Sequence, residues 1–231
     1  MPSLSANEPC ETEFSGSEGI ESLMDRATGS LSSGRFIESE RISDEALHRA
    51  WKSGQYGLMS RILLPLQEAR RQRRLAAAET GKVFIVEEGQ VIPGSDEGSM
   101  ASGCYVVMPP NVAADARQIR MNGLAQGVSV MAFACEPRTQ AGLLPVAVVG
   151  PCALRTRLKP VKTFAVSWCL EVVEALASEA LMYMDRTRPI EKQVDILMDY
   201  LDALPESEEF HLELAEAAKS AAGQGVVNES S

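Results

Sequence analysis

Short apolar runs rich in valine mark the middle of the chain as a buried sheet. Runs at 104–108, 128–135 and 145–149 are bounded by Gly and Pro, which is typical of strands covered on both faces. Residues 112–126 have helical length and connect the first two runs, so a right-handed crossover should leave these two strands parallel. The link 136–144 is too short for another helix. The third strand should therefore pair antiparallel with the second.

Helical periodicity dominates both ends of the chain. Apolar residues recur three and four positions apart on either side of the central region, which predicts amphipathic helices. Pro65 falls inside one of them and should kink it. With a further strand at 83–87, the sequence predicts an α-rich α/β protein, in which a small mixed sheet of three to four strands is flanked by N-terminal and C-terminal helical hairpins. The expected helices run from Ile20 to the break at Ser33-Gly34, then over 36–51, 55–78, 167–184, 189–204 and 206–222.

The same patterns divide the chain into five segments. Both termini are poor in apolar residues and are expected to be disordered, and a loop rich in Gly and Ser at 89–103 precedes the main sheet. A basic passage after Gly150-Pro151 is expected to be irregular. The segments are a disordered acidic tail (1–18), a helical hairpin region (19–79), the α/β sheet region (80–162), a C-terminal helical region (163–222) and a second disordered tail (223–231).

The N-terminal hairpin resembles a tetratricopeptide repeat over residues 20–66. The triplet Gly34-Arg35-Phe36, followed by Ala46-Leu47, looks like the middle of such a repeat, whose period is about 34 residues. Leu23 and Ala27 take a large and a small position of the first helix, and Tyr56 and Ser60 follow each by thirty-three residues. The resemblance implies a groove between helices that holds a peptide or protein segment. Ser39 and Ser43 depart from the family pattern, so an unrelated helical hairpin remains the alternative.

Composition and charge narrow the class of protein. The 231 residues are 45% hydrophobic and 23% charged, and the net charge is −10, as in ordinary globular proteins. Residues 1–21 and 191–231 hold most of the acidic excess, which opposes nucleic-acid binding. No apolar run approaches the roughly 20 residues of a membrane span, and the N-terminus lacks a secretory pattern. Five scattered cysteines suggest a reduced protein. A cytoplasmic protein is expected.

Few residues are suited to catalysis. Only His48 and His211 could act as imidazole bases, and each lies in a predicted amphipathic helix, where a surface or groove position is expected. The chain has no H-E-x-x-H, no Cys/His cluster and no Gly-rich phosphate loop, so we expect no catalytic constellation, no metal and no cofactor.

Topology nevertheless indicates one candidate ligand site. Ligands of open α/β sheets lie outside the carboxyl ends of parallel strands, here at Asn111 and at Glu136 to Arg138. Asn111 could cap the following helix, whose amides beside Asp115 would form an anion pocket with Arg138, opposed by Glu136. Alternatively, Asn111 only caps, and Glu136 and Arg138 are solvated loop charges.

A second candidate is the basic run Arg70, Arg71, Arg73 and Arg74. It could bind an acidic partner or the chain's own acidic tail, or it could be a solvated helix face. Taken together, these features predict a non-enzymatic interaction or adaptor protein with a protein or peptide partner. The alternative is a small-ligand-binding or enzymatic α/β domain that uses the strand-end crevice. A subunit of a larger assembly stays open as well, because the sequence leaves the oligomeric state undecided.

Overall fold

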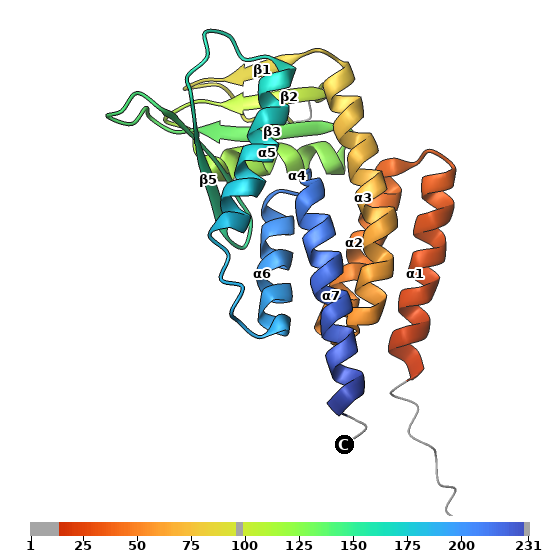
Figure 1. Ribbon diagram of the computed structural model, residues 1–231. Coiled ribbons are helices and arrows are strands. Elements are labelled where there is room, and N and C mark those ends of the chain that lie inside the picture. The colour runs from red at the N-terminus through yellow and green to blue at the C-terminus, as the bar shows by residue number, and fades with distance from the viewer. Residues whose placement is uncertain (1–13, 96–98, 229–231) are drawn as a thin grey trace, which may run out of the picture.

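The computed structural model describes residues 14–95 and 99–228 of the chain. They form a five-stranded mixed sheet with helices on both faces and a layer of long helices beside it (Figure 1). The prediction of an α-rich α/β protein is confirmed, with one strand more than expected. The elements are α1 (Phe14–Ser32), α2 (Phe36–Lys52), α3 (Tyr56–Glu79), β1 (Val83–Val86), β2 (Gly103–Val107), α4 (Ala113–Ala125), β3 (Val130–Cys135), β4 (Leu144–Val149), β5 (Ala153–Leu158), α5 (Val166–Met182), α6 (Ile190–Ala203) and α7 (Glu208–Asn228).

The strands lie in sequence order across the sheet. β1, β2 and β3 are parallel, whereas β4 and β5 are each antiparallel to the preceding strand. The predicted parallel crossover through α4 and the antiparallel return of β4 are both confirmed. The additional strand is β5, in the passage that was expected to be irregular. Its buried residues Leu154 and Thr156 alternate with the exposed Arg155 and Arg157, so the arginines conceal an ordinary two-residue strand period.

Two buried clusters cover the faces of the sheet. On one face, Tyr105 and Val107 of β2 belong to the same buried cluster as Ile119 of α4. Cys104 and Val106 point to the opposite face, which is covered by α3 and α5 (Figure 1). Because side chains alternate along a strand, residues of one apolar run reach both clusters.

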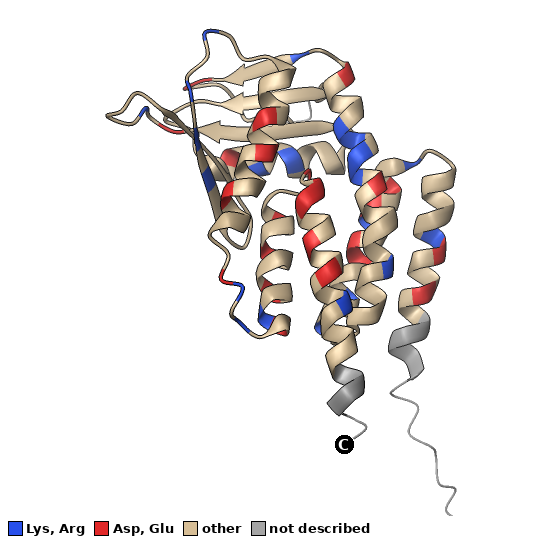
Figure 2. Cartoon of the chain, viewed as in Figure 1, with Lys and Arg blue, Asp and Glu red and all other residues tan. Residues whose placement is uncertain are grey.

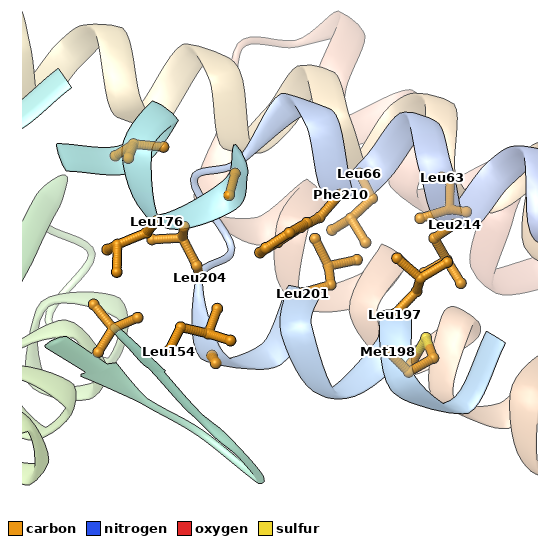
Figure 3. Close-up of a cluster of buried hydrophobic side chains, with 14 of the residues drawn as sticks. Leu63, Leu66, Leu154, Leu176, Leu197, Met198, Leu201, Leu204, Phe210 and Leu214 are labelled. Atoms are coloured by element: carbon orange, nitrogen blue, oxygen red, sulfur yellow. The ribbon is translucent and has the colours of Figure 1, made fainter. Parts of the chain in front are cut away.

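The helical layer shares its core with one face of the sheet. Helices α1, α2, α3 and α7 pack one against the next, and α6 packs against α7 (Figure 1). Leu66 of α3, Leu201 of α6 and Phe210 of α7 meet in this core, which continues to Leu176 of α5 and Leu154 of β5 (Figure 3). A continuous buried cluster therefore joins the two ends of the chain to the sheet.

Two glycines explain why the N-terminal helices end where they do. Gly34 and Gly54 adopt positive φ values of 73° and 68° directly after α1 and α2. The following amides of Arg35 and Gln55 donate to Ser30 O and Ala50 O at 2.9 Å, which is the Schellman pattern of a helix C-terminus. These are the breaks that the sequence predicts. The turns at these glycines produce helical hairpins. Because helical hairpins occur in many unrelated folds, the resemblance to a tetratricopeptide repeat stays a prediction.

Each of the two segments predicted as tails overlaps a helix of the described chain. Helix α1 begins at Phe14, within the predicted tail 1–18, and α7 ends at Asn228, within the predicted tail 223–231. The rest of both predicted tails, residues 1–13 and 229–231, lies outside the described residues. Within the described ranges, no helix is both long enough and apolar enough to span a bilayer.

Candidate functional site

The most unusual feature of the molecule is a set of buried charges where the helical layer meets the sheet. Figure 2 shows Lys and Arg gathered at the end of α3 nearest the sheet, beside acidic residues. Glu40 of α2, Arg70 and Arg73 of α3, Arg120 of α4 and Glu206 before α7 are each 2–6% exposed. Buried charges are rare unless they are paired, so each of these five side chains requires a partner in the interior.

Glu40 is the centre of the well-paired half. One of its carboxylate oxygens lies 3.2 Å from Arg70 Nε, and the other lies 2.7 Å from Arg73 Nε. Arg70 also donates through Nη2 to Asp44 Oδ1 at 2.8 Å. Burial alone would lower the pKa of Arg70, but Asp44 and Glu40 together raise it above its ordinary value. Arg70 is therefore a fully charged side chain with adequate partners.

The other half, around Glu206, is loosely paired. The carboxylate oxygens of Glu206 lie 4.0 Å from Arg73 Nη2 and 4.0 Å from Arg120 Nη1, beyond hydrogen-bond distance. Arg120 donates through Nη2 to Val149 O at 3.3 Å. Within the described part of the chain, Arg73 Nη1, Arg120 Nη1 and both Glu206 oxygens have no hydrogen-bond partner. Arg73 Nε and the Glu40 oxygen 2.7 Å from it form an ion pair without hydrogen-bond geometry. Strong donors thus remain unsatisfied in the interior.

A cleft of about 260 Å³ opens onto these arginines between α2, α3, α4 and the end of α6. We call it the arginine cleft. Its walls carry both signs of charge, and three less polar residues complete the lining. The lining consists of Arg70, Arg73, Arg117 and Arg120, the acids Glu40, Asp44 and Asp202, and His48, Met121, Leu124 and Pro205.

The electrostatics differ between the two ends of the cleft. Burial lowers the pKa of Arg120; Glu206 opposes this effect, and Arg73 and Arg117 lower the pKa further. An arginine keeps its charge at neutral pH even so. Three arginines meet at this end of the cleft, Arg73, Arg117 and Arg120. They outnumber the two acids nearest to Arg73, Glu40 and Glu206.

His48 lies at the acidic end. Its Nδ1 lies 2.9 Å from the backbone oxygen of Asp44, and its Nε2 lies 3.3 Å from Asp202 Oδ2. The hydrogen bond to Asp202 is the main reason that the pKa of His48 is raised to about 9, against the opposing effect of burial. The imidazole is therefore protonated at neutral pH. His48 also lines the cleft, in agreement with the predicted surface or groove position.

Among the described residues, the side chains of Asp44, His48 and Asp202 form a group whose spacing suits a metal ion. One potential ligand atom from each of Asp44, His48 and Asp202 lies within 4.8 Å of the other two. However, both imidazole nitrogens already face oxygen acceptors. A metal would have to displace the proton from Nε2, so the geometry fits an imidazolium that links α2 to α6.

His211 corrects the expectation of a surface or groove histidine, because it is 2% exposed. Its Nδ1 lies 2.7 Å from Ser207 O, and its Nε2 lies 3.4 Å from Arg70 Nη1. Burial, followed by the charge of Arg70, lowers the pKa of His211 to about 3. The ring is neutral and accepts from Arg70 on Nε2. Its role is to support the buried arginine from the side of α7.

The basic run of α3 is divided by the packing. Arg70 and Arg73 are buried, so the solvated-face interpretation is wrong for these two. The side chain of Arg71 is 49% exposed and lies 3.8 Å from Glu68. Arg74 pairs with Glu208 and donates to Glu206 O at 3.3 Å. Arg73 and Arg74 therefore face acids of the predicted C-terminal helical region, Glu206 and Glu208.

The structure brings together only part of the predicted strand-end site. Asn111 and Glu136 line a crevice of about 360 Å³ at the ends of β2 and β3, whereas Asp115 and Arg138 do not. Arg138 is exposed, and Glu136 pairs with Arg155 of β5 at 2.8 Å.

The predicted capping by Asn111 is wrong. The N-cap residue of α4 is Val112, whose backbone amide donates to Asp115 Oδ2 at 2.7 Å. Asn111 Nδ2 instead donates to Glu87 O at 3.2 Å. The carboxylate of Asp115 therefore occupies part of the space that the predicted anion would have used at this helix end.

Sequence reasoning missed most of the arginine cleft, including Glu40, Arg117, Arg120 and Asp202. A signal for Glu40 and Arg73 exists, because each lies seven residues from a buried leucine on the same helix, Leu47 and Leu66. Residues seven apart share a helix face. No comparable signal brings Arg120 or Asp202 to the same place.

Comparisons with protein-family models, with curated proteins and with solved structures gave no match.

Proposed function

We propose that this chain is a non-enzymatic interaction protein that holds a segment of a protein partner across the arginine cleft. The observation that carries the proposal is the cleft itself, an open site with charged walls between the helical layer and the sheet. Its rim adds Met121, which is 52% exposed, beside Leu124 and Pro205. Methionine at a rim adapts to varied partners. The expected segment has an acidic group flanked by apolar residues.

The state of the reactive side chains supports binding over catalysis. His48 is held protonated between two oxygen acceptors, and His211 is buried with both nitrogens engaged. Neither is placed as a general base that acts near neutral pH. Burial raises the pKa of Cys135 to about 12, so its thiol is a poor nucleophile. The resemblance of residues 20–66 to a tetratricopeptide repeat, which implies peptide binding between helices, points in the same direction.

A selection of peptides from a random display library tests this function. The full chain should enrich peptides with acidic and apolar residues, and Arg117→Glu should abolish the enrichment because this arginine lines the cleft at an exposed position. Arg71→Glu is the matched control, since Arg71 is exposed on the outer side of the buried cluster. If Arg71→Glu abolishes enrichment and Arg117→Glu does not, the partner surface lies on the outside of α3 and the proposal is wrong.

A second candidate is a small-ligand site in the strand-end crevice. The crevice lies at the carboxyl ends of β2 and β3, where open α/β sheets place ligands. Asn111 and Glu136 are its polar residues, and Cys135 contributes to the wall. An NMR titration with small carboxylic acids and nucleotides separates the two sites. Shifts confined to the crevice would favour this candidate, and shifts at the arginine cleft would favour the first.

A further inference from the structure

Two guanidinium groups leave hydrogen-bond donors unused at the inner end of the arginine cleft. Arg73 and Arg120 are 2% and 5% exposed, and the Nη1 atom of each has no partner among the described residues. A buried charged donor without an acceptor is strongly unfavourable. Both residues line the cleft. The missing acceptor can therefore come from whatever occupies the cleft.

The acids nearby do not supply this acceptor. Glu40 lies against the Nε atoms of Arg70 and Arg73, and Asp44 is held by Arg70. Asp202 is paired with His48, at the other end of the cleft. Glu206 approaches the arginines only to 4.0 Å and is not part of the lining. Arg73 Nη1 and Arg120 Nη1 are therefore left without an acceptor among the described residues, and both arginines line the cleft.

The arginine cleft has room for an oxyanion. A cavity of about 260 Å³ has room for about eight water molecules at roughly 30 Å³ each, which a phosphate or carboxylate group could replace in part. Guanidinium groups match the oxygens of these anions with paired, charge-assisted hydrogen bonds. Arg117 lies at the exposed side of the same cleft, where it can reach a bound anion without first being desolvated.

We infer that the inner end of the arginine cleft is an oxyanion subsite, in which Arg73 and Arg120 donate to a phosphate or carboxylate group and Arg117 contacts it from the rim. The inference deepens the proposed function by naming the group that anchors the partner. It does not depend on the partner being a peptide, because the same donors would take the group from a free ion.

Calorimetric titration of the full chain with inorganic phosphate, at constant ionic strength set with chloride, tests the subsite. Saturable binding is expected, and Arg117→Ala should weaken it about tenfold or more, the effect of losing one charge-assisted hydrogen bond. Arg120→Lys keeps the charge and removes the paired donors, so it should weaken binding similarly while keeping the fold. Arg71→Ala is the control and should bind as the unchanged chain does.

Two peptides of one sequence, containing either phosphoserine or glutamate, then identify the source of the anion. Competition of either peptide with inorganic phosphate supports the subsite, and the tighter peptide identifies its preferred group. Heat released equally by phosphate and by additional chloride, or unchanged binding in Arg117→Ala, would overturn the inference and leave ordered water as the partner of the donors. Peptide binding that phosphate does not displace would remove the subsite but keep the proposed function. Phosphate binding without any peptide binding would keep the oxyanion subsite and remove the proposed function.

Discussion

Replacing Glu40 with glutamine tests whether the buried charges are as tightly linked as their distances indicate. Glutamine has nearly the same shape as glutamate, so Glu40→Gln opens no cavity and removes only the negative charge. In the native protein this charge faces Arg70 Nε at 3.2 Å and Arg73 Nε at 2.7 Å. All three side chains are at most 6% exposed. The variant therefore leaves two guanidinium groups in the interior with one counter-charge fewer.

The expected loss follows from burial. Removing one partner of a buried ion pair destabilises a protein by about 3–5 kcal/mol, because the remaining charge is left without compensation. We expect a value near 3 kcal/mol, the lower end, since Asp44 stays 2.8 Å from Arg70 and the amide oxygen of glutamine still accepts one hydrogen bond. In a protein of 150–250 residues, 1 kcal/mol shifts the Tm by about 2–4 °C. The Tm should therefore fall by about 6–12 °C.

Urea unfolding followed by circular dichroism measures this loss, and helix α2 provides the control. Glu45 also pairs with an arginine, Arg49, but its side chain is 43% exposed. Glu45→Gln should change the free energy of unfolding by less than about 1 kcal/mol, as for other surface pairs. The m-value should stay unchanged in both variants. If Glu40→Gln is no more destabilising than Glu45→Gln, the buried cluster does not have the electrostatic importance that we assign to it.

Three further predictions concern protonation and backbone packing. The pKa of His48 is raised to about 9, so its contact with Asp202 stabilises the fold fully below pH 6.5 and this contribution is lost as the pH rises through 9. The native protein should therefore be more stable than His48→Gln by about 1 kcal/mol at pH 6, after allowing for partial exposure, and equally stable at pH 10. The pKa of His211 is lowered to about 3, so below pH 6.5 the unfolded chain binds a proton that the native chain does not. Between pH 6 and 4 the free energy of unfolding, measured with urea, should therefore fall more steeply for the native sequence than for His211→Gln, by up to about 1.4 kcal/mol per pH unit. A Cβ at Gly150 would lie 2.7 Å from a backbone atom of Ala203, so Gly150→Ala should destabilise the protein by about 1–3 kcal/mol. Gly29 of α1 is the control, because a Cβ there has no neighbour within 4 Å, and Gly29→Ala should stabilise the protein by about 0.5–1 kcal/mol; equal effects of the two substitutions in thermal melts would contradict the assigned contacts.

Local sequence patterns were sufficient to predict most of the helices and strands. The strands β2, β3 and β4 are apolar runs between Gly and Pro, and their pairing follows from the lengths of the connections. The exception is β5, whose outward positions hold Arg155 and Arg157 and give the segment the polarity of a loop, although the positions that alternate with them are buried. The period of a strand, rather than its overall polarity, was the informative quantity.

The candidate site was harder to predict because its residues meet only through packing. Arg70 and Arg73 look like a solvated basic run when they are considered as a sequence. On the helix they continue the buried stripe of Leu63 and Leu66, which identifies them as interior positions. Arg120 lines the same cleft from α4, which lies between β2 and β3 in sequence. Such a meeting depends on how α4 and α3 approach each other, which no local pattern specifies.

The unequal satisfaction of the buried charges is the strongest reason to assign them a role in binding. Replacing buried ion pairs with apolar side chains of similar volume is often neutral or stabilising, so leucines like those one turn earlier on α3 could hold these helices together without the desolvation of charges. A network that serves the fold alone is expected to satisfy its own donors. Here Arg70 is satisfied by Glu40, Asp44 and His211, whereas Arg73 and Arg120 keep donors without a partner among the described residues. The unsatisfied donors of Arg73 and Arg120 belong to residues that line an open cleft. A bound oxyanion completes their hydrogen bonds, and the free protein then carries a local instability that its ligand removes.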